Sequence, residues 1–303
     1  MADEARPPLD VVVVAYRSGE VLGQCLSAVS AFAPAGTRII VADNSPDDPS
    51  AAEAVGRTPG AELRPQRGNV GFAAAVNDVL KRTTAEVVLL LNPDIGAITG
   101  SFATVADVFA RVPDAGGLAV HLAKENGILE HCRHFPVAAD FFGTALGGLS
   151  PRRGSSDRGP MLDWDHEDER VVESATGALL FLRRAALDDV GPLDERYFMY
   201  FEETDWLIRA RARGWQLVFT PAIRAVHYGR QSSGSEPETH SLLYLESMYV
   251  FVEKQFGRAT AALLRLTWIA TDGARLAVSV RKPTAYRREV RKRLGVHLGR
   301  RAH

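Results

Sequence analysis

Short β-branched runs alternate with amphipathic segments in the first third of the chain, and this alternation restricts the fold more than any other feature. Residues 11–15 and 38–42 are such runs, and the segment between them, residues 20–31, places its apolar residues at helical spacing. Two further units follow, with strands predicted at residues 61–65 and 87–91 and helices at residues 71–82 and 101–111. Strands that alternate with helices pack as a parallel sheet covered by helices on both faces. The sequence therefore predicts an α/β fold with a Rossmann-like, mostly parallel sheet.

The composition is that of a globular protein. The chain has 303 residues, 46% of them hydrophobic, and a net charge of −1, so it can bury a sizeable core. Cys25 and Cys132 are far apart and lack a metal-ligand spacing, which favours inert thiols in a reducing compartment. No apolar stretch is long enough to span a membrane, and residues 1–10 lack the apolar core of a secretion signal. We therefore expect a cytoplasmic protein.

The second half of the chain divides into a long connection and a helical end. Residues 140–171 are rich in Gly, Pro, Ser and charge and predict a connection without regular structure. From residue 240 to residue 280 the apolar residues follow helical spacing. We therefore predict a catalytic domain of residues 1–238 and a C-terminal helical appendage of residues 239–303.

The C-terminal tail is basic. Residues 281–303 carry nine Lys or Arg and one acidic residue, whereas the other 280 residues carry 27 basic and 36 acidic ones. Such a tail can make a peripheral contact with an anionic membrane, where each charge contributes about 1 kcal/mol, or it can be a solvated helix without a partner. It holds one aromatic residue, Tyr286, and no helix-turn-helix or zinc spacing. We therefore expect no nucleic-acid partner.

The turn after the first predicted strand excludes two common nucleotide-binding loops. Residues 15–19 read Ala-Tyr-Arg-Ser-Gly and lack the G-x-G-x-x-G of dinucleotide-binding folds. The Walker pattern G-x-x-x-x-G-K-[ST] is missing as well. A dehydrogenase and a common ATPase or GTPase are therefore excluded, and any nucleotide must be held in another way.

Polar residues follow two of the predicted strands at the point where each strand ends. Asp43 follows the strand at residues 38–42, and Asn92-Pro93-Asp94 follows the apolar run of residues 87–91. The carboxyl ends of parallel strands are a favoured place for ligand groups in open α/β sheets. Asx-rich turns also cap strands and helices without any ligand, so this structural interpretation stays open for residues 44–48.

Three carboxylates crowd residues 201–205, which read Phe-Glu-Glu-Thr-Asp at the start of a helix predicted for residues 202–213. Neighbouring carboxylates raise one another's pKa unless a cation or hydrogen bonds keep them ionised, which suits a group that works near neutral pH. They can instead complement the helix dipole, and Asp205 can pair with Arg209 on the helix surface. Farther along, His227 follows another predicted strand and is either a metal ligand or a structural histidine.

Glycines and small residues dominate residues 67–77, which read Arg-Gly-Asn-Val-Gly-Phe-Ala-Ala-Ala-Val-Asn. Small residues let a ligand approach the backbone closely, and a helix that begins here would present N–H groups to a diphosphate. Close packing of the helix on the sheet explains the same residues equally well.

These motifs occur in an order that resembles a known family. The order is Val-Val-Ala-Tyr at residues 13–16, then residues 42–45, 68–72, 91–94 and 191–203, and finally His227. From about residue 9 to residue 257 the chain resembles family 2 glycosyltransferases of GT-A fold. Within that family it is most similar to bacterial rhamnosyltransferases that elongate polyprenyl-diphosphate-linked glycans.

The resemblance implies a donor site with a divalent cation, Mn²⁺ or Mg²⁺. Asp94 and His227 stand where the family holds the metal. Asn92 stands where many relatives have a first aspartate, and because an amide is a weaker ligand for a hard cation, Asn92 can face the ribose instead. The residues placed against the nucleotide are Ala15, Tyr16, Asp43, Arg67, Asn69, Gly71, Asn77 and Asn92.

The same resemblance implies an inverting displacement in which Glu203 is the general base. Many relatives have aspartate at this position, so the longer Glu203 can need a displaced acceptor, or Glu202 can share the role. The implied donor is dTDP-L-rhamnose, with another nucleotide sugar as the alternative. The implied acceptor is a hydroxyl of a glycan or glycolipid, with a natural-product aglycone as the alternative. A nucleotide-sugar-binding module without catalysis is a further alternative, and a homo-oligomer remains open.

Overall fold

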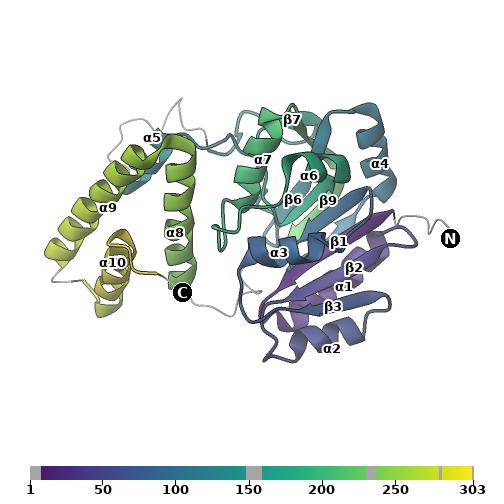
Figure 1. The fold of residues 1–303 in the computed structure, drawn as a ribbon, viewed down its shortest axis with the longest axis horizontal. Coiled ribbons are helices and arrows are strands. Elements are labelled where there is room, and N and C mark those ends of the chain that lie inside the picture. Colours follow the sequence, from purple (N-terminus) through teal and green to yellow (C-terminus); the bar gives the residue numbers. More distant parts are fainter. Residues whose placement is uncertain (1–7, 148–158, 230–236, 280–281, 302–303) are drawn as a thin grey trace. The chain divides into compact units, whose positions relative to one another are not determined.

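The computed structural model describes residues 8–147, 159–229, 237–279 and 282–301, and Figure 1 shows its arrangement of strands and helices. The strands are β1 (Leu9–Ala15), β2 (Arg38–Asp43), β3 (Ala61–Pro65), β4 (Val87–Leu91), β5 (Ile95–Thr99), β6 (Ala115–Lys124), β7 (Arg170–Val172), β8 (Leu179–Arg183) and β9 (Gln216–His227). The helices are α1 (Gly19–Phe32), α2 (Ser50–Gly56), α3 (Phe72–Leu80), α4 (Phe102–Arg111), α5 (Ala138–Ala145), α6 (Arg184–Val190), α7 (Glu202–Ala212), α8 (Pro237–Phe256), α9 (Arg258–Val278) and α10 (Thr284–His297).

The nine strands of the described residues belong to one sheet, in the order β3-β2-β1-β4-β8-β6-β9-β5, with β7 paired to β9. Strands β3, β2, β1 and β4 run parallel, as do β6 and β9, whereas β8 is antiparallel to both of its neighbours. Every residue of β1 and β4 is buried, as expected for parallel strands covered on both faces. The α/β class predicted from the sequence is confirmed.

Helices cover both faces of this sheet. Val11 and Val13 of β1 share one core with α1, whose buried side chains are Leu22, Cys25, Leu26 and Val29. The helix α3 packs on β1 and β2 outside that core. At the first turn of α3, Gly71 has a φ of 86°, which a non-glycine residue rarely adopts. The glycine at this position is therefore required by the entry into the helix.

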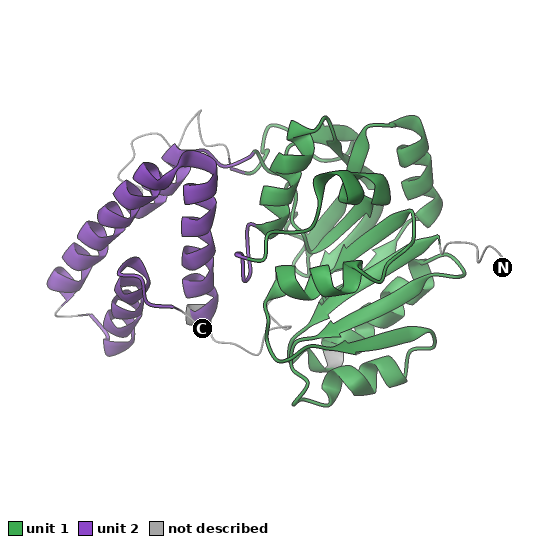
Figure 2. Cartoon of the chain, in the orientation of Figure 1, with its two compact units in different colours: residues 1–134, 160–195, 202–234 green, residues 135–159, 196–201, 235–303 purple. Residues whose placement is uncertain are grey.

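Contacts divide the chain into two compact units, which Figure 2 colours separately. Unit 1 comprises residues 1–134, 160–195 and 202–234 and holds the sheet, and unit 2 comprises residues 135–159, 196–201 and 235–303 and is helical. The division into a catalytic domain of residues 1–238 and a helical appendage of residues 239–303 stays a prediction. No described helix is both long enough and apolar enough to cross a membrane.

The predicted elements of unit 1 are confirmed, with ends that differ by a few residues. Strand β4 covers residues 87–91 as predicted, and α7 ends one residue before its predicted end. The connection predicted for residues 140–171 was partly wrong, because α5 extends to Ala145 and β7 begins at Arg170. Residues 148–158 of this segment lie outside the described residues.

Candidate active site

Pairing of strands brings Asp94 and His227 together although 132 residues separate them in the sequence. Asp94 lies between β4 and β5, and β5 runs antiparallel to β9 with Ile95 opposite His227. The backbone carbonyl of Asp94 accepts a hydrogen bond from Tyr228 N at 3.0 Å. In this register the His227 Nε2 atom lies 3.2 Å from Asp94 Oδ1. The two residues predicted to hold a metal are therefore neighbours.

A second carboxylate, Glu130, contacts the other side of the His227 ring. The chain turns back after β6 through Gly127, which has a φ of 79°, and Glu130 N donates to the Leu122 carbonyl at 2.8 Å. This turn places Glu130 Oε1 2.9 Å from His227 Nδ1. Burial opposes the charged form of His227, but hydrogen bonds to Asp94 and Glu130 outweigh it and raise the pKa of His227 to about 9.

The segment Thr176–Ala178 links the Asn92-Pro93-Asp94 turn to Glu203. Asn92 N donates to the Ala178 carbonyl at 2.8 Å, so the segment runs beside the end of β4. At Gly177 an added Cβ atom would lie 3.3 Å from Glu203 Cγ. Glu203 is therefore held against the same strand end that carries Asp94. A residue with a Cβ atom at position 177 would leave less room for the Glu203 side chain.

The two glutamates that open α7 have different surroundings. Glu202 is 6% exposed, and burial together with the neighbouring Glu203 raises its pKa well above the ordinary value. Glu203 is half-buried. Burial also raises the pKa of Glu203, but backbone hydrogen bonds and the Arg133 guanidinium work in the opposite direction. Glu203 is therefore the more accessible and the more readily ionised of the pair.

The third carboxylate of this helix has a structural partner. Asp205 is fully buried, and its Oδ2 atom accepts a hydrogen bond from Arg209 Nε at 3.0 Å. Arg209 also donates to the carbonyls of Val190 and Pro192, at 2.9 and 2.8 Å. The ion pair predicted from the sequence is present. Its carboxylate is buried and its guanidinium is partly exposed, and through Arg209 it ties α7 to the turn that follows α6.

Two loops meet where the resemblance places the nucleotide. Asp43 is buried, and its Oδ1 atom accepts a hydrogen bond from Ser45 N at 2.9 Å. The Asn44 Nδ2 group donates to the Gly71 carbonyl at 3.1 Å and to Asn69 Oδ1 at 3.3 Å. The structure therefore brings the residues after β2 together with the loop that opens α3. Asn44 was predicted only as part of an Asx-rich turn.

The other predicted nucleotide-binding residues differ in how accessible they are. Tyr16 is half-buried at the end of β1, directly after the buried Ala15, and Arg67 is exposed. Asn77 is 3% exposed, and its amide bonds to the Leu193 backbone through both Nδ2 and Oδ1, at 2.9 and 3.0 Å. Its Nδ2 group also donates to Glu195 Oε1 at 2.9 Å. The described contacts of Asn77 therefore hold the loop before α7 to α3.

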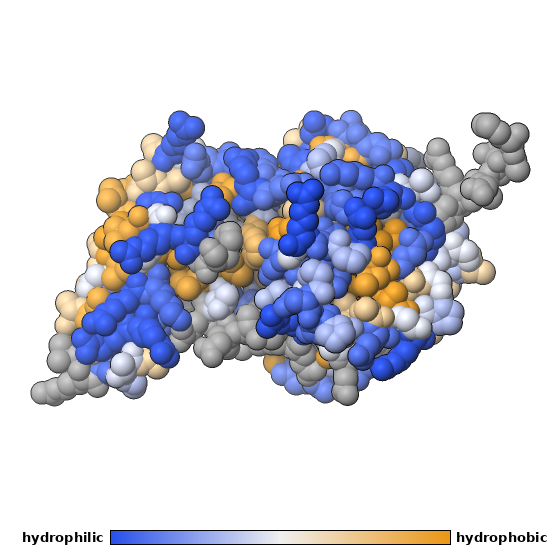
Figure 3. All heavy atoms as spheres, turned by 60° about the horizontal axis from the view of Figure 1, so that its bottom comes forward, coloured by the Kyte–Doolittle hydropathy of each residue, from blue (hydrophilic) through white to orange (hydrophobic). Residues whose placement is uncertain are grey.

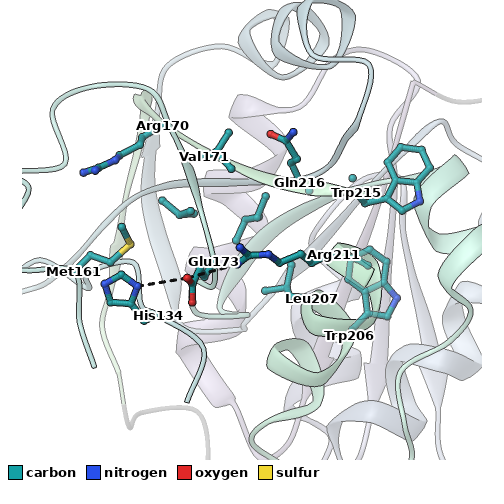
Figure 4. A pocket seen from close by; sticks show the side chains of 15 residues that line it. His134, Met161, Arg170, Val171, Glu173, Trp206, Leu207, Arg211, Trp215 and Gln216 are labelled. Atoms are coloured by element: carbon teal, nitrogen blue, oxygen red, sulfur yellow. Dashed lines mark ion pairs between the residues drawn. The ribbon is translucent and has the colours of Figure 1, made fainter. Parts of the chain in front are cut away.

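A cavity of about 490 Å³ lies in unit 1 beside the middle of α7. Figure 4 shows Glu173 between His134 and Arg211, with N···O distances of 3.7 and 3.5 Å, and Trp206 and Trp215 near one end. None of the residues predicted for donor, metal or catalysis lines this cavity. The carboxylates and the histidine that the sequence indicated therefore lie outside it.

Sequence reasoning missed Glu130 and Arg133. Glu130 is a single acidic residue outside any motif, and only the turn after β6 brings it to His227. Arg133 exchanges backbone hydrogen bonds with Ser174, at 2.8 and 3.0 Å. The positive charge of its guanidinium works to lower the pKa of Glu203. Nothing in the local sequence of either residue signals these partners. Both cysteines are buried and free, and burial raises the pKa of each to about 12, so both thiols stay protonated near neutral pH, which agrees with the prediction of inert thiols.

Comparison with known proteins gives a family and full-length relatives. A family model described as glycosyltransferase like family 2 matches residues 7–266. An N-acetylglucosaminyl-diphospho-decaprenol L-rhamnosyltransferase of Mycobacterium tuberculosis is 29% identical over 313 residues, covering 96% of this chain and 98% of the relative. The rhamnosyltransferase WbbL of Escherichia coli is 27% identical over 103 residues, which cover 34% of this chain and 36% of that protein.

Solved structures share the fold. The mannosyltransferase PcManGT from Pyrobaculum calidifontis, in complex with GDP-Man and Mn²⁺, superposes with a TM-score of 0.51 at 15% identity and covers 97% of this chain and 81% of its own. GalNAc-T7 with UDP, GalNAc and Mn²⁺ superposes with a TM-score of 0.57 at 12% identity and covers 99% and 56%. The GT-A fold predicted from the sequence is confirmed by these neighbours.

Proposed function

Because the chain belongs to the glycosyltransferase-like family 2, we propose that it transfers L-rhamnose from dTDP-L-rhamnose to a hydroxyl group of a polyprenyl-diphosphate-linked glycan. The relative from Mycobacterium tuberculosis carries this donor sugar and a lipid-linked acceptor in its name and aligns with nearly the whole chain. The observation that carries the proposal is the pairing of Asp94 with His227 after β4, next to a segment whose Ala178 accepts a hydrogen bond from Asn92 and whose Gly177 packs against Glu203.

Asp94 and His227 fit a divalent cation. Two ligands of an octahedral ion with bonds of roughly 2.1 Å lie about 3 Å apart, and Asp94 Oδ1 and His227 Nε2 are 3.2 Å apart. A carboxylate with an imidazole suits Mn²⁺ better than Mg²⁺. The described residues do not include a group of three or more His, Cys, Asp or Glu side chains that would complete a site. The donor diphosphate and water would supply the other ligands, as they commonly do for such ions.

Glu130 positions His227 for this task. Its Oε1 atom accepts the Nδ1 hydrogen at 2.9 Å, which directs Nε2 toward Asp94. A metal-ligating histidine usually donates its other ring N–H to such a carboxylate, which fixes the tautomer and the ring orientation. Coordination requires the loss of the Nε2 proton, and the bond from Nδ1 to Glu130 would remain. We therefore assign Glu130 a positioning role.

Glu203 acts as the general base. It takes the proton of the acceptor hydroxyl while that oxygen attacks the anomeric carbon, and the bond from this carbon to the diphosphate breaks with inversion. A bound cation supplies charge neutralisation for the leaving nucleoside diphosphate. Burial raises the pKa of both glutamates, and Glu203 is the more exposed of the two, which supports Glu203 rather than Glu202 as the group that meets the acceptor.

Asp43 and the loop of residues 67–71 hold the nucleotide in this proposal. The support is their meeting through Asn44 at the carboxyl ends of β1 and β2, a common ligand position in α/β sheets. Asn92, next to the same edge, faces the ribose. For a lipid-linked acceptor and a nucleotide-sugar donor, we propose that the reaction occurs at the inner face of the cell membrane, with residues 281–303 as a peripheral contact.

A donor screen with the full-length protein tests the proposal. The protein is incubated with Mn²⁺ or Mg²⁺ and a panel of nucleotide sugars, with and without chelator, and its melting temperature is recorded. Release of nucleoside diphosphate is then measured with a short-chain N-acetylglucosaminyl-diphospho-polyprenol. We expect stabilisation by dTDP-L-rhamnose and metal-dependent dTDP release. Stabilisation by a different donor would replace the sugar assignment, and donor binding without release in the presence of acceptor would favour a non-catalytic binding module.

A further inference from the structure

Arg133 is an exposed cation beside the proposed base. Among the residues that the structure describes, its guanidinium has no ion-pair or hydrogen-bond partner. Hydrophilic residues (blue) are common on the surface that Figure 3 shows, so exposure alone does not distinguish this arginine. A surface arginine such as Arg111 pairs with a carboxylate, that of Glu169, at 3.0 Å. The guanidinium of Arg133 is instead left available for a ligand.

The backbone of Arg133 is held from two sides. Its N–H and its carbonyl exchange hydrogen bonds with Ser174, and the carbonyl of the preceding Cys132 accepts a bond from Met161 N at 2.8 Å. Arg133 also forms an antiparallel bridge with Pro160. Three short segments therefore lie side by side, with Arg133 in the middle one. A side chain on such a fixed backbone loses less freedom when it binds a ligand.

The alternation of side chains directs Arg133 away from the cavity beside α7. Successive residues of an extended segment point to opposite faces. His134 and Glu173, the neighbours of the paired residues, both line the cavity and lie 3.7 Å apart there (Figure 4). Arg133 therefore lies on the other side of its segment. Gly177, on the strip of chain that pairs with Arg133, packs against Glu203, which brings the arginine and the proposed base to the same region.

Arg133 and Glu203 lie close together without forming an ion pair. The positive charge works to lower the pKa of Glu203, but within the described residues the two side chains are not bonded to each other. In an inverting displacement the attacking oxygen enters on the face opposite the leaving group. Because Glu203 takes the proton of the attacking oxygen in the proposed reaction, a cation beside Glu203 lies on the side of the acceptor and not of the departing nucleotide.

We infer that Arg133 binds the diphosphate of the lipid-linked acceptor. A guanidinium presents paired N–H donors that match two phosphate oxygens. In an N-acetylglucosaminyl-diphospho-polyprenol a single sugar separates the reacting hydroxyl from the diphosphate, so the hydroxyl meets Glu203 while the diphosphate meets the arginine. The cation also reduces the repulsion between the diphosphate and the carboxylate. This inference rests on the proposed function, and it adds the residue that distinguishes a diphosphate-linked acceptor from an uncharged one.

Two acceptors and three variants of the full-length protein test the inference. One acceptor is a short-chain N-acetylglucosaminyl-diphospho-polyprenol, and the other carries the same sugar joined to the same lipid without the diphosphate. Calorimetric titration in the presence of Mn²⁺ and dTDP measures the binding of each, and dTDP release gives kcat and KM. The variants are Arg133→Ala, Arg133→Lys and the control Arg57→Ala, because the Arg57 side chain is 79% exposed in the same unit. Thermal melts check that each variant is folded.

We expect the wild type and the Arg57 variant to bind the diphosphate acceptor more tightly than the uncharged one. Arg133→Ala should weaken binding of the diphosphate acceptor by about 10 to 100-fold, because a charge-assisted contact is lost. Its affinity for the uncharged acceptor should change by less than about twofold, and the KM for dTDP-L-rhamnose should stay the same. Arg133→Lys keeps the charge but loses the paired donors, so it should retain part of the affinity.

The inference is overturned if the wild type binds both acceptors equally, if Arg133→Ala weakens both to the same extent, or if this variant raises the KM for the donor instead. A loss confined to kcat and equal for both acceptors would show that Arg133 acts only on the base. Acceptor binding is measured without sugar transfer. A failure of the proposed donor in the release assay therefore leaves the titrations to decide the role of Arg133.

Discussion

The two units place charge and apolar surface in opposite ways. In unit 1 the apolar side chains fill the space between sheet and helices, and the charged groups Asp94, His227 and Glu203 gather at strand and helix ends. Along α9 of unit 2 the charged Asp272 is buried with two arginines, while leucines face outward. In unit 1 charge is therefore concentrated where the proposed donor site lies, whereas along α9 charge is buried and apolar side chains stay exposed.

Replacement of the proposed general base, Glu203, is the strongest test of the chemical role of the charged groups in unit 1. Glu203→Gln keeps the size of the side chain but cannot take a proton, so we expect the turnover rate to fall by about 10² to 10⁴-fold, with donor binding retained. Initial rates and calorimetric titration with the donor measure the two effects. Glu202→Gln is the matched control, because Glu202 is buried and its pKa is raised well above the ordinary value. If Glu202→Gln lost the activity and Glu203→Gln kept it, the roles would be exchanged.

Asp272→Asn should have the largest effect on unit 2. It leaves Arg275 and Arg293, whose side chains are 30% and 22% exposed, without their carboxylate. Breaking a fully buried pair typically costs about 3–5 kcal/mol of unfolding free energy, and because water reaches both arginines we expect a loss at the low end of this range. Denaturant unfolding followed by circular dichroism measures the loss. The control is Glu253→Gln, since Glu253 and its partner Arg258 are both exposed and such pairs contribute about 1 kcal/mol or less. Equal stability of the Asp272 variant and the wild type would contradict the structural role of the cluster.

A low pH should weaken the ionic cluster around Asp272. Burial opposes ionisation of Asp272, but hydrogen bonds from His297 and Arg275 outweigh it and lower the pKa of Asp272 below its ordinary 3.8. A carboxylate with a lowered pKa stabilises the fold above its unfolded pKa and loses this contribution as the pH falls through the folded pKa. The wild type should therefore lose stability relative to Asp272→Asn only below about pH 4. If the difference in unfolding free energy between the wild type and Asp272→Asn became smaller between pH 8 and pH 5, a group other than Asp272 would be responsible for the pH dependence.

Replacement of Glu130 in unit 1 should have a smaller effect. Loss of a carboxylate that orients a metal-binding histidine lowers metal affinity by about 10 to 100-fold, and we expect this range for Glu130→Ala. Glu130→Gln keeps an acceptor oxygen and should lose less. Electron paramagnetic resonance of free Mn²⁺ in the presence of dTDP measures the affinity directly. Glu125→Ala, at an exposed position of the same turn, is the control, and an equal loss in this variant would remove the special role of Glu130.

The fold of unit 1 was largely predictable because its signals are local. Residues 87–91 are a continuous apolar run bounded by Asn-Pro-Asp, and the structure makes them a fully buried strand. Strand β8, Leu179–Arg183, is an equally apolar run, but it runs antiparallel between β4 and β6. No local pattern in the sequence predicts with which strand an apolar run will pair. Pairing depends on contacts between distant segments, which the sequence does not display.

The same limit applies to the candidate site. Asp94, His227 and Glu203 were predicted because each belongs to a motif or follows a strand, whereas Glu130 was missed because its contact with His227 depends on a turn that brings it back to β9. The helical spacing of residues 240–280 predicted helices, and α8 and α9 confirm them, but the sequence did not predict the orientation of α9, that is, which side of this helix is buried. That orientation is set by Asp272, a single acid whose partner Arg293 lies on another helix.

The smallest expected effect comes from Gly177. A Cβ atom there would lie 3.3 Å from Glu203 Cγ and 3.4 Å from its Cβ, so Gly177→Ala should displace the proposed base by a few tenths of an ångström. Misplacement by 1 Å can cost about 10²-fold in rate, so we expect roughly a tenfold loss or less. The loss should appear in kcat with an unchanged KM for the donor, because the acceptor proton is moved only in the chemical step. Gly23→Ala is the control, since its Cβ would meet nothing within 4 Å. A loss confined to KM would place Glu203 in donor binding, and wild-type kinetics would show that its position tolerates the shift.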